Sequence, residues 1–353
     1  MTVYIHTHDR ITFKRCRRKW AWGSDLRHNL EPELKVERDN LWFGVGFHFA
    51  LEDFHGYNRF GHPIHALEAY YASFPEIERP SRADELTELG IKMFEHYTDR
   101  WLPRRDDFKT YWVDGKPQVE VKFQLELADL STQYGMPVIY QGTLDRVVQD
   151  EHGRLWVEDY KTAAAIDINK LATDPQISAY LWAAEQWYEQ YFAGMVYTQF
   201  AKDAPSPPKI LRNGKPSLDK RQKTCHQMYR GVLLERFGDS RFPNEYVDFL
   251  NNLVGQETPE GDRYIRRDLV ERNFEAKANT YKHIMMEAEE MLNKHLYIYP
   301  NETRDCAWDC EFRTVCIALN EGADADYLLR EAFVKKGDRD EWRKRIKWPT
   351  PQS

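Results

Sequence analysis

Two acids and a lysine stand in a stretch of the chain whose other residues favour a β-strand. Residues 155–163 read LWVEDYKTA. Side chains alternate between the two faces of a strand, so Asp159 and Lys161 share one face while Glu158 and Tyr160 share the other. An acid and a base two residues apart therefore point to the same place.

The preceding segment is predicted to pair with this strand and to bring a second acid. Residues 136–150 read as a strand, and the DEHGR that follows favours a turn, which together indicate an antiparallel hairpin. If the hairpin turns about His152, Asp145 lies directly opposite Asp159. The alternative is a surface hairpin with a cross-strand salt bridge, in which a shift of one residue separates the two acids.

Opposed carboxylates indicate a bound cation. Two carboxylates directly across a sheet repel each other by up to about 1 kcal/mol, and by more when desolvated, so a strand retains them only with a cation between them. Asp145 and Asp159 would form an oxygen site suited to Mg²⁺ or Mn²⁺, able to hold a phosphodiester and activate a water. Lys161 would orient the water or neutralise the phosphate.

Composition limits the classes of protein to consider. The chain has 353 residues, of which 42% are hydrophobic and 14% aromatic, enough for a large packed core. The net charge of -7 argues against a protein that coats nucleic acid by overall attraction, so any such contact must be local. No apolar run approaches the roughly 20 residues of a membrane span, and the N-terminus lacks the apolar middle of a signal peptide. We therefore expect a cytoplasmic protein.

Helices are predicted to dominate the first third of the chain. Residues 11–22 place Cys16 on one helical face with two aromatic residues, and residues 41–56 again have helical period, with His48 in an aligned stripe. Residues 82–102 read as a longer amphipathic surface helix.

A sheet and a further helix are predicted to follow. From Gln118 the sequence alternates with period two, which indicates a strand carrying Glu120. Residues 173–192 read as a helix with Asp174 as its N-cap and Pro175 at its first position.

The remainder of the chain is predicted to be a loop and then helices. Residues 203–224 are rich in Pro, Gly and basic residues and read as a long basic loop. Two or three more helices should fill residues 219–295, and no internal repeat is visible.

The motif GTLDRVVQD…LWVEDYKTA resembles the D…(D/E)xK signature of the PD-(D/E)XK nuclease superfamily. The resemblance is strongest to its RecB-like branch, which includes CRISPR-associated RecB-like exonucleases and phage-encoded relatives. Two further features match this branch: His48, in FGVGFHFALE, and Gln176 with Tyr180, in DPQISAY. A lone helical His is more often structural, and a Gln/Tyr pair four apart is common on helix surfaces. Their order around the signature makes them a constellation.

The resemblance implies an α/β fold with a restriction-endonuclease-like core, in which helices flank a central mixed sheet. It implies that Asp145, Asp159 and Lys161 are catalytic. It further implies the metal ligands His48, Asp145, Asp159 and the backbone carbonyl of Tyr160, and a role for Gln176 and Tyr180 in positioning DNA or the lysine. Glu120 and Glu158 are possible additional participants.

Three cysteines crowd together near the C-terminal end. Cys306, Cys310 and Cys316 are spaced C-x3-C-x5-C, close enough for one soft-metal site but one ligand short. Cys16 is the fourth ligand only if the two ends of the chain meet. Thiol chemistry alone does not separate Zn²⁺ from an iron–sulfur cluster, and the alternative is three packed small hydrophobic residues. Cys225 has no partner in this pattern, and we assign it no role.

The resemblance to the RecB-like branch favours an iron–sulfur cluster over Zn²⁺ at these cysteines. Several members of the branch carry one N-terminal and three C-terminal cysteines that bind a [4Fe–4S] cluster. Such a staple would make residues 1–353 a single elaborated nuclease domain, with the helical C-terminal part joined to the N-terminus. Its parts would be an N-terminal helical part at about 1–115 and a catalytic sheet and helix at about 116–200. A basic loop with helices would follow at about 201–300, and a cysteine cluster with a basic tail at about 301–353.

Four basic segments are candidates for phosphate contacts. Their residues are 14–20, 209–223, 263–267 and 334–348. Each alone is a solvated face, but together they fit a channel leading to the metals, with Trp342 and Trp348 as surfaces on which unpaired bases could stack.

The leading hypothesis is a metal-dependent DNA nuclease, most simply an exonuclease on single-stranded or end-bearing DNA. The phage-encoded relatives suggest a role in recombination of phage DNA, which would place the protein in a host cytoplasm. One alternative is a non-catalytic DNA-binding accessory protein of recombination or repair with the same fold. Another is a nuclease acting on RNA or on flap structures, since the motifs act on the phosphodiester and not on the sugar.

Overall fold

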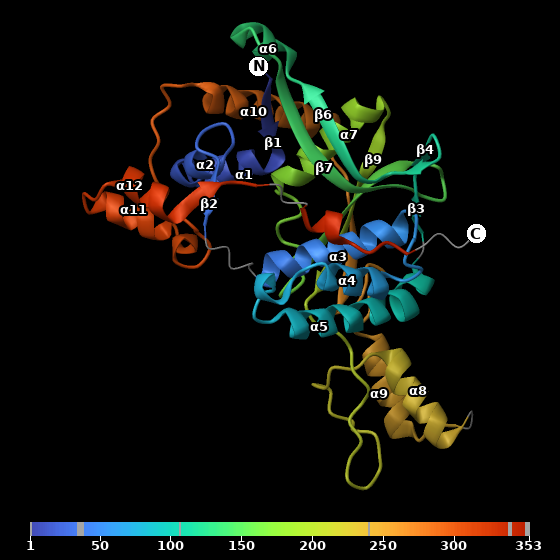
Figure 1. The fold of residues 1–353 in the computed structure, drawn as a ribbon. Coiled ribbons are helices and arrows are strands. Elements are labelled where there is room, and N and C mark those ends of the chain that lie inside the picture. Colours follow the sequence, from blue (N-terminus) through green and yellow to red (C-terminus); the bar gives the residue numbers. More distant parts are fainter. Residues whose placement is uncertain (1, 34–38, 106, 239–240, 338–340, 350–353) are drawn as a thin grey trace.

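The computed structural model describes residues 2–33, 39–105, 107–238, 241–337 and 341–349. Its centre is a seven-stranded sheet with the order β1-β7-β8-β9-β10, in which β3 and β6 also pair with β7 (Figure 1). The pairs β1–β7 and β8–β9 are parallel, and β6–β7, β7–β8 and β9–β10 are antiparallel. The sheet is therefore mixed. The strands are β1 (Val3–His6), β3 (Lys109–Thr110), β6 (Val119–Glu126), β7 (Val138–Gln149), β8 (Leu155–Ala163), β9 (Phe192–Ala201) and β10 (Ile265–Val270).

Helices cover both faces of this sheet, each over its own hydrophobic core (Figure 1). Because β9 lies between β8 and β10 with both faces covered, all of its residues are buried and its sequence is almost continuously apolar. One core is formed with α1 (Thr7–Arg15), α2 (Arg17–Gly23), α7 (Pro175–Tyr188) and α10 (Phe274–Leu292). The other is formed with α3 (Asp39–His55), α4 (Pro63–Ala72) and α5 (Ala83–His96).

Two smaller units lie outside these layers. One contains α8 (His226–Phe237) and α9 (Asn244–Val254), which pack on each other over a separate cluster of buried residues and project from the body (Figure 1). The other contains α11 (Arg313–Asn320), α12 (Ala325–Ala332) and a two-stranded sheet of β2 (Leu30–Pro32) and β11 (Phe333–Lys335). The remaining regular elements are β4 (Trp112–Val113), β5 (Lys116–Pro117), α6 (Ala128–Tyr134) and short helical turns at Glu76–Glu78, Tyr97–Trp101, Leu102–Arg104, Arg304–Ala307 and Glu341–Arg345.

The structure confirms the central sequence predictions. β6 begins at Val119, the hairpin joins β7 to β8, and α7 has the expected start, since the Asp174 side chain accepts a hydrogen bond from the Gln176 N–H and Pro175 is the first helical residue. Residues 203–224 contain no helix and no strand beyond one isolated bridge. The mixed α/β architecture with a central sheet between helices is also as predicted.

Several local predictions were wrong. Helices dominate the first third as predicted, but β1 was not foreseen and joins the central sheet, and β10 lies where only helices were expected. The helix predicted at 11–22 is broken at Cys16, whose φ of -161° is extended, so the segment forms α1 and α2. No helix in the described part of the chain is long and apolar enough to span a membrane.

Candidate active site

The β7–β8 hairpin has the predicted register. Arg146 pairs with Glu158 and Val147 with Val157, and continuing this register by one residue brings Asp145 opposite Asp159. The Tyr160 N–H donates to Asp145 Oδ2 at 2.8 Å, which fixes the carboxylate of β7 beside the backbone of β8. The alternative of a shifted surface hairpin is therefore wrong.

His48 reaches the hairpin from α3, which packs against the sheet on the side of the α3–α5 core. Its Nδ1 lies 3.5 Å from Asp145 Oδ2, and 27% of its side chain is exposed. The stripe that contains His48 is not the buried face of α3, because Leu41 is 61% exposed while Phe43 and Phe47 fill the core. The helix thus presents His48 towards the hairpin and keeps its aromatic residues in the protein interior.

Asp159 and Lys161 form a close ion pair on β8. Lys161 Nζ lies 2.9 Å from Asp159 Oδ1 and 2.7 Å from Oδ2, and Asp159 is 1% exposed. Two-residue spacing along a strand places both side chains on one face, as the sequence predicts. His48, Asp145, Asp159 and Lys161 are thereby brought together by α3, β7 and β8.

Glu120, which the sequence predicts only as a possible additional participant, joins this group from β6. Single ligand atoms of His48, Glu120 and Asp145 all lie within 4.8 Å of one another. The β6–β7 ladder pairs the residues on either side but skips Glu120 and Asp145, and Glu120 has a left-handed φ of 47°. Alternating apolarity cannot reveal such a local backbone irregularity. The imidazole and carboxylate donors of this group fit a divalent cation such as Mg²⁺ or Mn²⁺.

Burial and the charges of neighbouring groups determine the pKa values of the acids in the site. Burial raises the pKa of Glu120 to about 8, with a further increase from Asp145 that His48 opposes. Burial also raises the pKa of Asp159 to about 6, because it outweighs the opposing effect of Lys161 and is reinforced by Asp145. The pKa of Asp145 shifts in the opposite direction. Burial raises it, but His48 and Lys161 together outweigh burial and hold the pKa below its usual value.

Lys161 stays charged in this environment. Burial disfavours its ammonium group, but Asp159 and Asp145 outweigh that effect and raise the pKa of Lys161 well above its usual value. At neutral pH the lysine is therefore a fixed positive charge and not a proton acceptor.

The two predicted positioning residues lie on the first turns of α7. Tyr180 is 7% exposed, and burial together with the nearby Asp159 raises its pKa to about 12. Tyr180 therefore lies near the Asp159–Lys161 pair. Gln176, one turn earlier, is half-buried and lines a small depression between α7 and α1 together with Tyr180.

Glu158 belongs to a different part of the protein from its neighbour Asp159. It is fully buried and accepts hydrogen bonds from Arg146 and Tyr160 at Oε2 and from Thr198 and Arg267 at Oε1, at 2.8 to 3.0 Å. We expected it as a possible participant in the active site. Its position on the opposite face of β8 makes it the centre of a buried ionic network beneath the site.

Two of the residues predicted to contact substrate are also internal. Arg267 is 8% exposed because it pairs with Glu158, and Arg266 pairs with Asp268 at 2.7 Å. Trp342 is 6% exposed and packs among aromatic residues of the α3–α5 core, so it cannot stack on a base, whereas Trp348 is 42% exposed. Three residues of the fourth basic segment, 338–340, lie outside the described residues.

The two ends of the chain meet at the cysteines. Cys16 Sγ accepts from the Asn301 N–H at 3.5 Å, and Cys306 Sγ lies 3.8 Å from the Asn301 carbonyl oxygen. Arg18, just after Cys16, donates to Cys316 Sγ at 3.1 Å. Burial raises the pKa of the Cys310 thiol, to which Cys16 also contributes. The four predicted ligands therefore lie in one region, while Cys225 is buried elsewhere.

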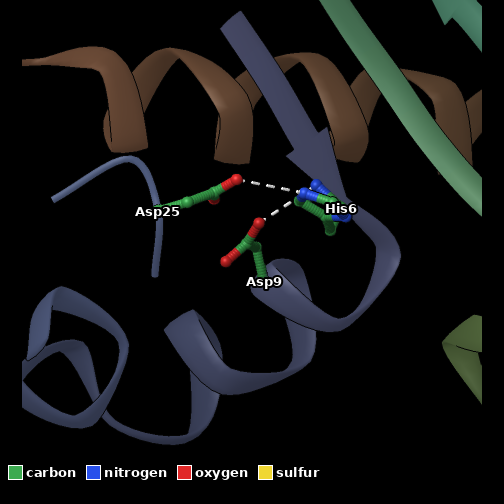
Figure 2. A group of neighbouring side chains, drawn as sticks. All are labelled: His6, Asp9 and Asp25. Atoms are coloured by element: carbon green, nitrogen blue, oxygen red, sulfur yellow. Dashed lines mark hydrogen bonds and ion pairs between the residues drawn. The ribbon is translucent and has the colours of Figure 1, made fainter. Parts of the chain in front are cut away.

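A second cluster of possible ligands lies at the start of α1, where sequence reasoning predicted no site. It consists of His6, Asp9 and Asp25 (Figure 2). Asp9 Oδ2 accepts the His6 N–H at 3.0 Å as part of a capping box, and Asp25 Oδ2 lies 3.3 Å from His6 Nε2. Helix capping and an ion pair account for this cluster without a bound ion.

Comparison with known proteins agrees with this geometry. The family model described as "PD-(D/E)XK nuclease superfamily" matches residues 11–317, which include all of the elements that carry the site. No curated protein matches the chain. Nucleases of this superfamily hydrolyse phosphodiester bonds with divalent metals such as Mg²⁺ or Mn²⁺, and the group around Asp145 offers an acidic site for one. The chain belongs to the PD-(D/E)XK nuclease superfamily.

Proposed function

We propose that this protein is a DNA exonuclease of the RecB-like branch that acts on single-stranded or end-bearing DNA. The observation that carries the proposal is the convergence of His48 from α3 with Asp145, Asp159 and Lys161 from the β7–β8 hairpin, about 100 residues further along the chain. A non-catalytic DNA-binding protein has no need of clustered acids beside a lysine, and this cluster is costly to keep without a cation.

Each residue of the site has a distinct task in this proposal. His48, Asp145 and Asp159 would hold Mg²⁺ or Mn²⁺, together with the backbone carbonyl of Tyr160. The metal supplies Lewis acidity and lowers the pKa of a bound water. Lys161 keeps its proton, so it would neutralise a phosphate oxygen or orient the attacking water. Tyr180 and Gln176 would help to position the DNA or Lys161.

An exposed aromatic surface supports a single-stranded substrate. Tyr57 and Trp112 are 52% and 48% exposed and lie edge to face with their ring centroids 6.0 Å apart. The Arg59 guanidinium lies 4.5 Å from the ring centroid of Trp348 and 5.0 Å from that of Tyr57. Aromatic rings with interleaved arginine provide stacking for unpaired bases, which a duplex keeps inside its helix.

This surface lies close enough to the site to guide a strand into it. Tyr57 lies just after the end of α3 at His55, which is about 10 Å from His48 along the helix axis at 1.5 Å per residue. A strand leaving the surface along α3 would reach the metal ligands.

The cysteines support a [4Fe–4S] cluster through the resemblance to the RecB-like branch, since one cysteine precedes the nuclease motifs and three follow them. Contacts through Asn301 and Arg18 bring Cys16 into the same region as Cys306 and Cys316. With the ends joined in this way, residues 1–353 would act as one nuclease unit.

The test is degradation of end-labelled single-stranded DNA, with Mn²⁺ and anaerobically purified protein. Wild type should release labelled products, whereas Asp159→Ala should release none while its circular dichroism stays unchanged. Glu151→Ala, an exposed acid on the hairpin turn, is the matched control and should cleave like wild type. Matched RNA and internally closed DNA circles distinguish DNA from RNA and exonuclease from endonuclease activity. Absence of cleavage by wild type with an intact cluster would refute the proposal.

A further inference from the structure

Positive charge is concentrated in residues 204–238, a segment that we call the basic arm. Eight of its residues are Lys or Arg and two are Asp or Glu, so the arm carries a net charge of +6. The whole chain carries -7, which leaves -13 for the remainder. A segment of one sign on a protein of the opposite sign attracts a polyanion locally, at that segment alone.

The basic arm stands clear of the layers that surround the active site. It consists of a loop, residues 204–224, and α8, and both project from the body beside α9 (Figure 1). The loop exposes Lys209, Arg212, Lys215 and Lys220. None of these four forms an ion pair with an acid in the described part of the chain, whereas Arg221 pairs with Asp219 at 3.0 Å. Four cations are therefore available to an anion from solution.

The loop is already ordered without a partner. Gly214, in the turn at its tip, has a φ of 75°, which glycine adopts without strain. The buried amide of Gln222 donates to the Ser217 carbonyl oxygen at 2.7 Å and accepts from the Lys209 N–H at 3.1 Å. The Tyr229 hydroxyl of α8 donates to the same Ser217 carbonyl oxygen at 3.1 Å. Cations on an ordered loop lose less conformational entropy when they bind, which favours binding.

The chemistry of the loop favours duplex DNA over unpaired DNA. Residues 204–224 include no aromatic residue, so the loop offers no ring on which an unpaired base could stack. Near its tip Ile210 and Leu211 are 54% and 48% exposed, and Arg212 follows them directly. Proteins that bind the minor groove of a duplex combine basic side chains with apolar residues that enter between base steps. The tip has both kinds of residue.

The basic arm starts at the edge of the sheet that carries the active site. Lys161 of β8 pairs with Gln199 of β9, and just before the arm the Lys202 N–H donates to the Ala163 carbonyl oxygen at 2.7 Å. Ile210 follows Gln199 by about 11 residues, so even an extended backbone would place it at most about 40 Å away. At 3.4 Å per base pair this distance corresponds to about 12 base pairs. A duplex on the arm can therefore have its end at the site.

We propose that the basic arm binds the duplex part of a DNA that ends in a single strand, with Ile210 and Leu211 in the minor groove and the lysines of the loop on the phosphates. The inference rests on the proposed nuclease function and assigns it a substrate, a duplex with a single-stranded end. The surface at Tyr57 and Trp112 then holds the unpaired end, and the basic arm holds the duplex behind it.

The test measures binding of such a junction DNA to anaerobically purified protein without Mn²⁺, by fluorescence anisotropy over a range of salt concentrations. Lys209→Gln with Lys215→Gln removes two phosphate contacts. The slope of log affinity against log salt should therefore become shallower by about 1.8, which amounts to about 60-fold in affinity at about 0.1 M salt when extrapolated from 1 M. Leu211→Ala should weaken binding and leave the slope unchanged, because it removes no charge.

A matched control removes the same charge elsewhere. Lys282 and Lys294 are exposed on α10 and just after it, at the other end of the molecule from the basic arm (Figure 1). Lys282→Gln with Lys294→Gln should bind the junction DNA like wild type. Circular dichroism of each variant should match that of wild type, since all four lysines are exposed.

A single-stranded oligonucleotide separates duplex binding from general attraction to DNA. The loss in Lys209→Gln with Lys215→Gln should be confined to the junction DNA. An equal loss on the single strand would overturn the inference, and so would wild-type affinity for the junction DNA, which would point to a partner other than DNA. If wild type cleaves single-stranded DNA with Mn²⁺ while the salt slopes are equal, only this inference fails. If wild type cleaves no DNA, the proposed function fails, and the slopes still decide what the arm binds.

Discussion

Removal of the Glu158 carboxylate should destabilise the protein more than any change to an exposed acid. The carboxylate accepts four hydrogen bonds, two of them from the buried guanidinium groups of Arg146 and Arg267. In Glu158→Ala both positive charges stay buried without their partner. Breaking a buried ion pair in this way costs about 3 to 5 kcal/mol. The free energy of unfolding should fall by that amount.

Equilibrium unfolding in urea, followed by tryptophan fluorescence, measures this loss. With a slope of about 3 kcal/mol per molar urea, the midpoint should fall by about 1 to 1.7 M. Glu151→Ala, whose side chain is 82% exposed on the hairpin turn, should change the unfolding free energy by no more than about 0.5 kcal/mol. In Glu158→Leu combined with Arg267→Met, the loss should be smaller than the sum of the single losses, since the two groups are in contact.

The same experiment decides between two roles for Glu158. A loss below about 1 kcal/mol would refute the network as a source of stability. A variant that keeps its stability but loses Mn²⁺ affinity would instead place Glu158 among the metal ligands, against the geometry described above.

Three further predictions concern other parts of the protein. Burial disfavours the charged imidazole of His96, but its hydrogen bond to Asp262 outweighs burial and raises the pKa of His96. This stabilisation is complete below about pH 6.5 and is lost as the pH rises through the raised pKa, so the unfolding free energy of wild type should fall relative to that of His96→Gln between about pH 6 and 9. Cys16→Ser should lose iron and the visible absorbance of the cluster, whereas Cys225→Ser should retain both. Trp112→Ala should weaken binding of a single-stranded oligonucleotide about 5- to 100-fold, measured by fluorescence anisotropy in the metal-free protein, and an unchanged affinity would refute the stacking surface.

The hairpin shows how much of the site could be predicted from sequence alone. Alternation of side chains and the turn at residues 150–154 were enough to predict the register, because a turn and a two-residue period leave few alternatives. α7 was predictable for a similar reason, since Asp174 and Pro175 act within their own helix turn.

The errors arise where long-range contacts decide the outcome. β1 has only four residues, and it becomes a strand because β7 is available to pair with it. Arg267 reads as part of a basic surface until the tertiary structure brings Glu158 to it. Glu120 reads as the outward residue of a regular strand, and nothing local reveals its left-handed backbone.

The contacts between the two ends of the chain can form only after the C-terminal segment has been synthesised. Arg15 pairs with Asp309 across 294 residues, and Cys16 lies against Asn301. A ribosome that adds about 5 to 20 residues per second needs roughly 15 to 60 s to travel from the first of these segments to the second. During that interval α1 and α2 have no C-terminal partner, and the thiol of Cys16 is open to oxidants. Assembly of the proposed cluster would have to follow the synthesis of residues 306–316, so the C-terminal segment would determine when Cys16 acquires its partners.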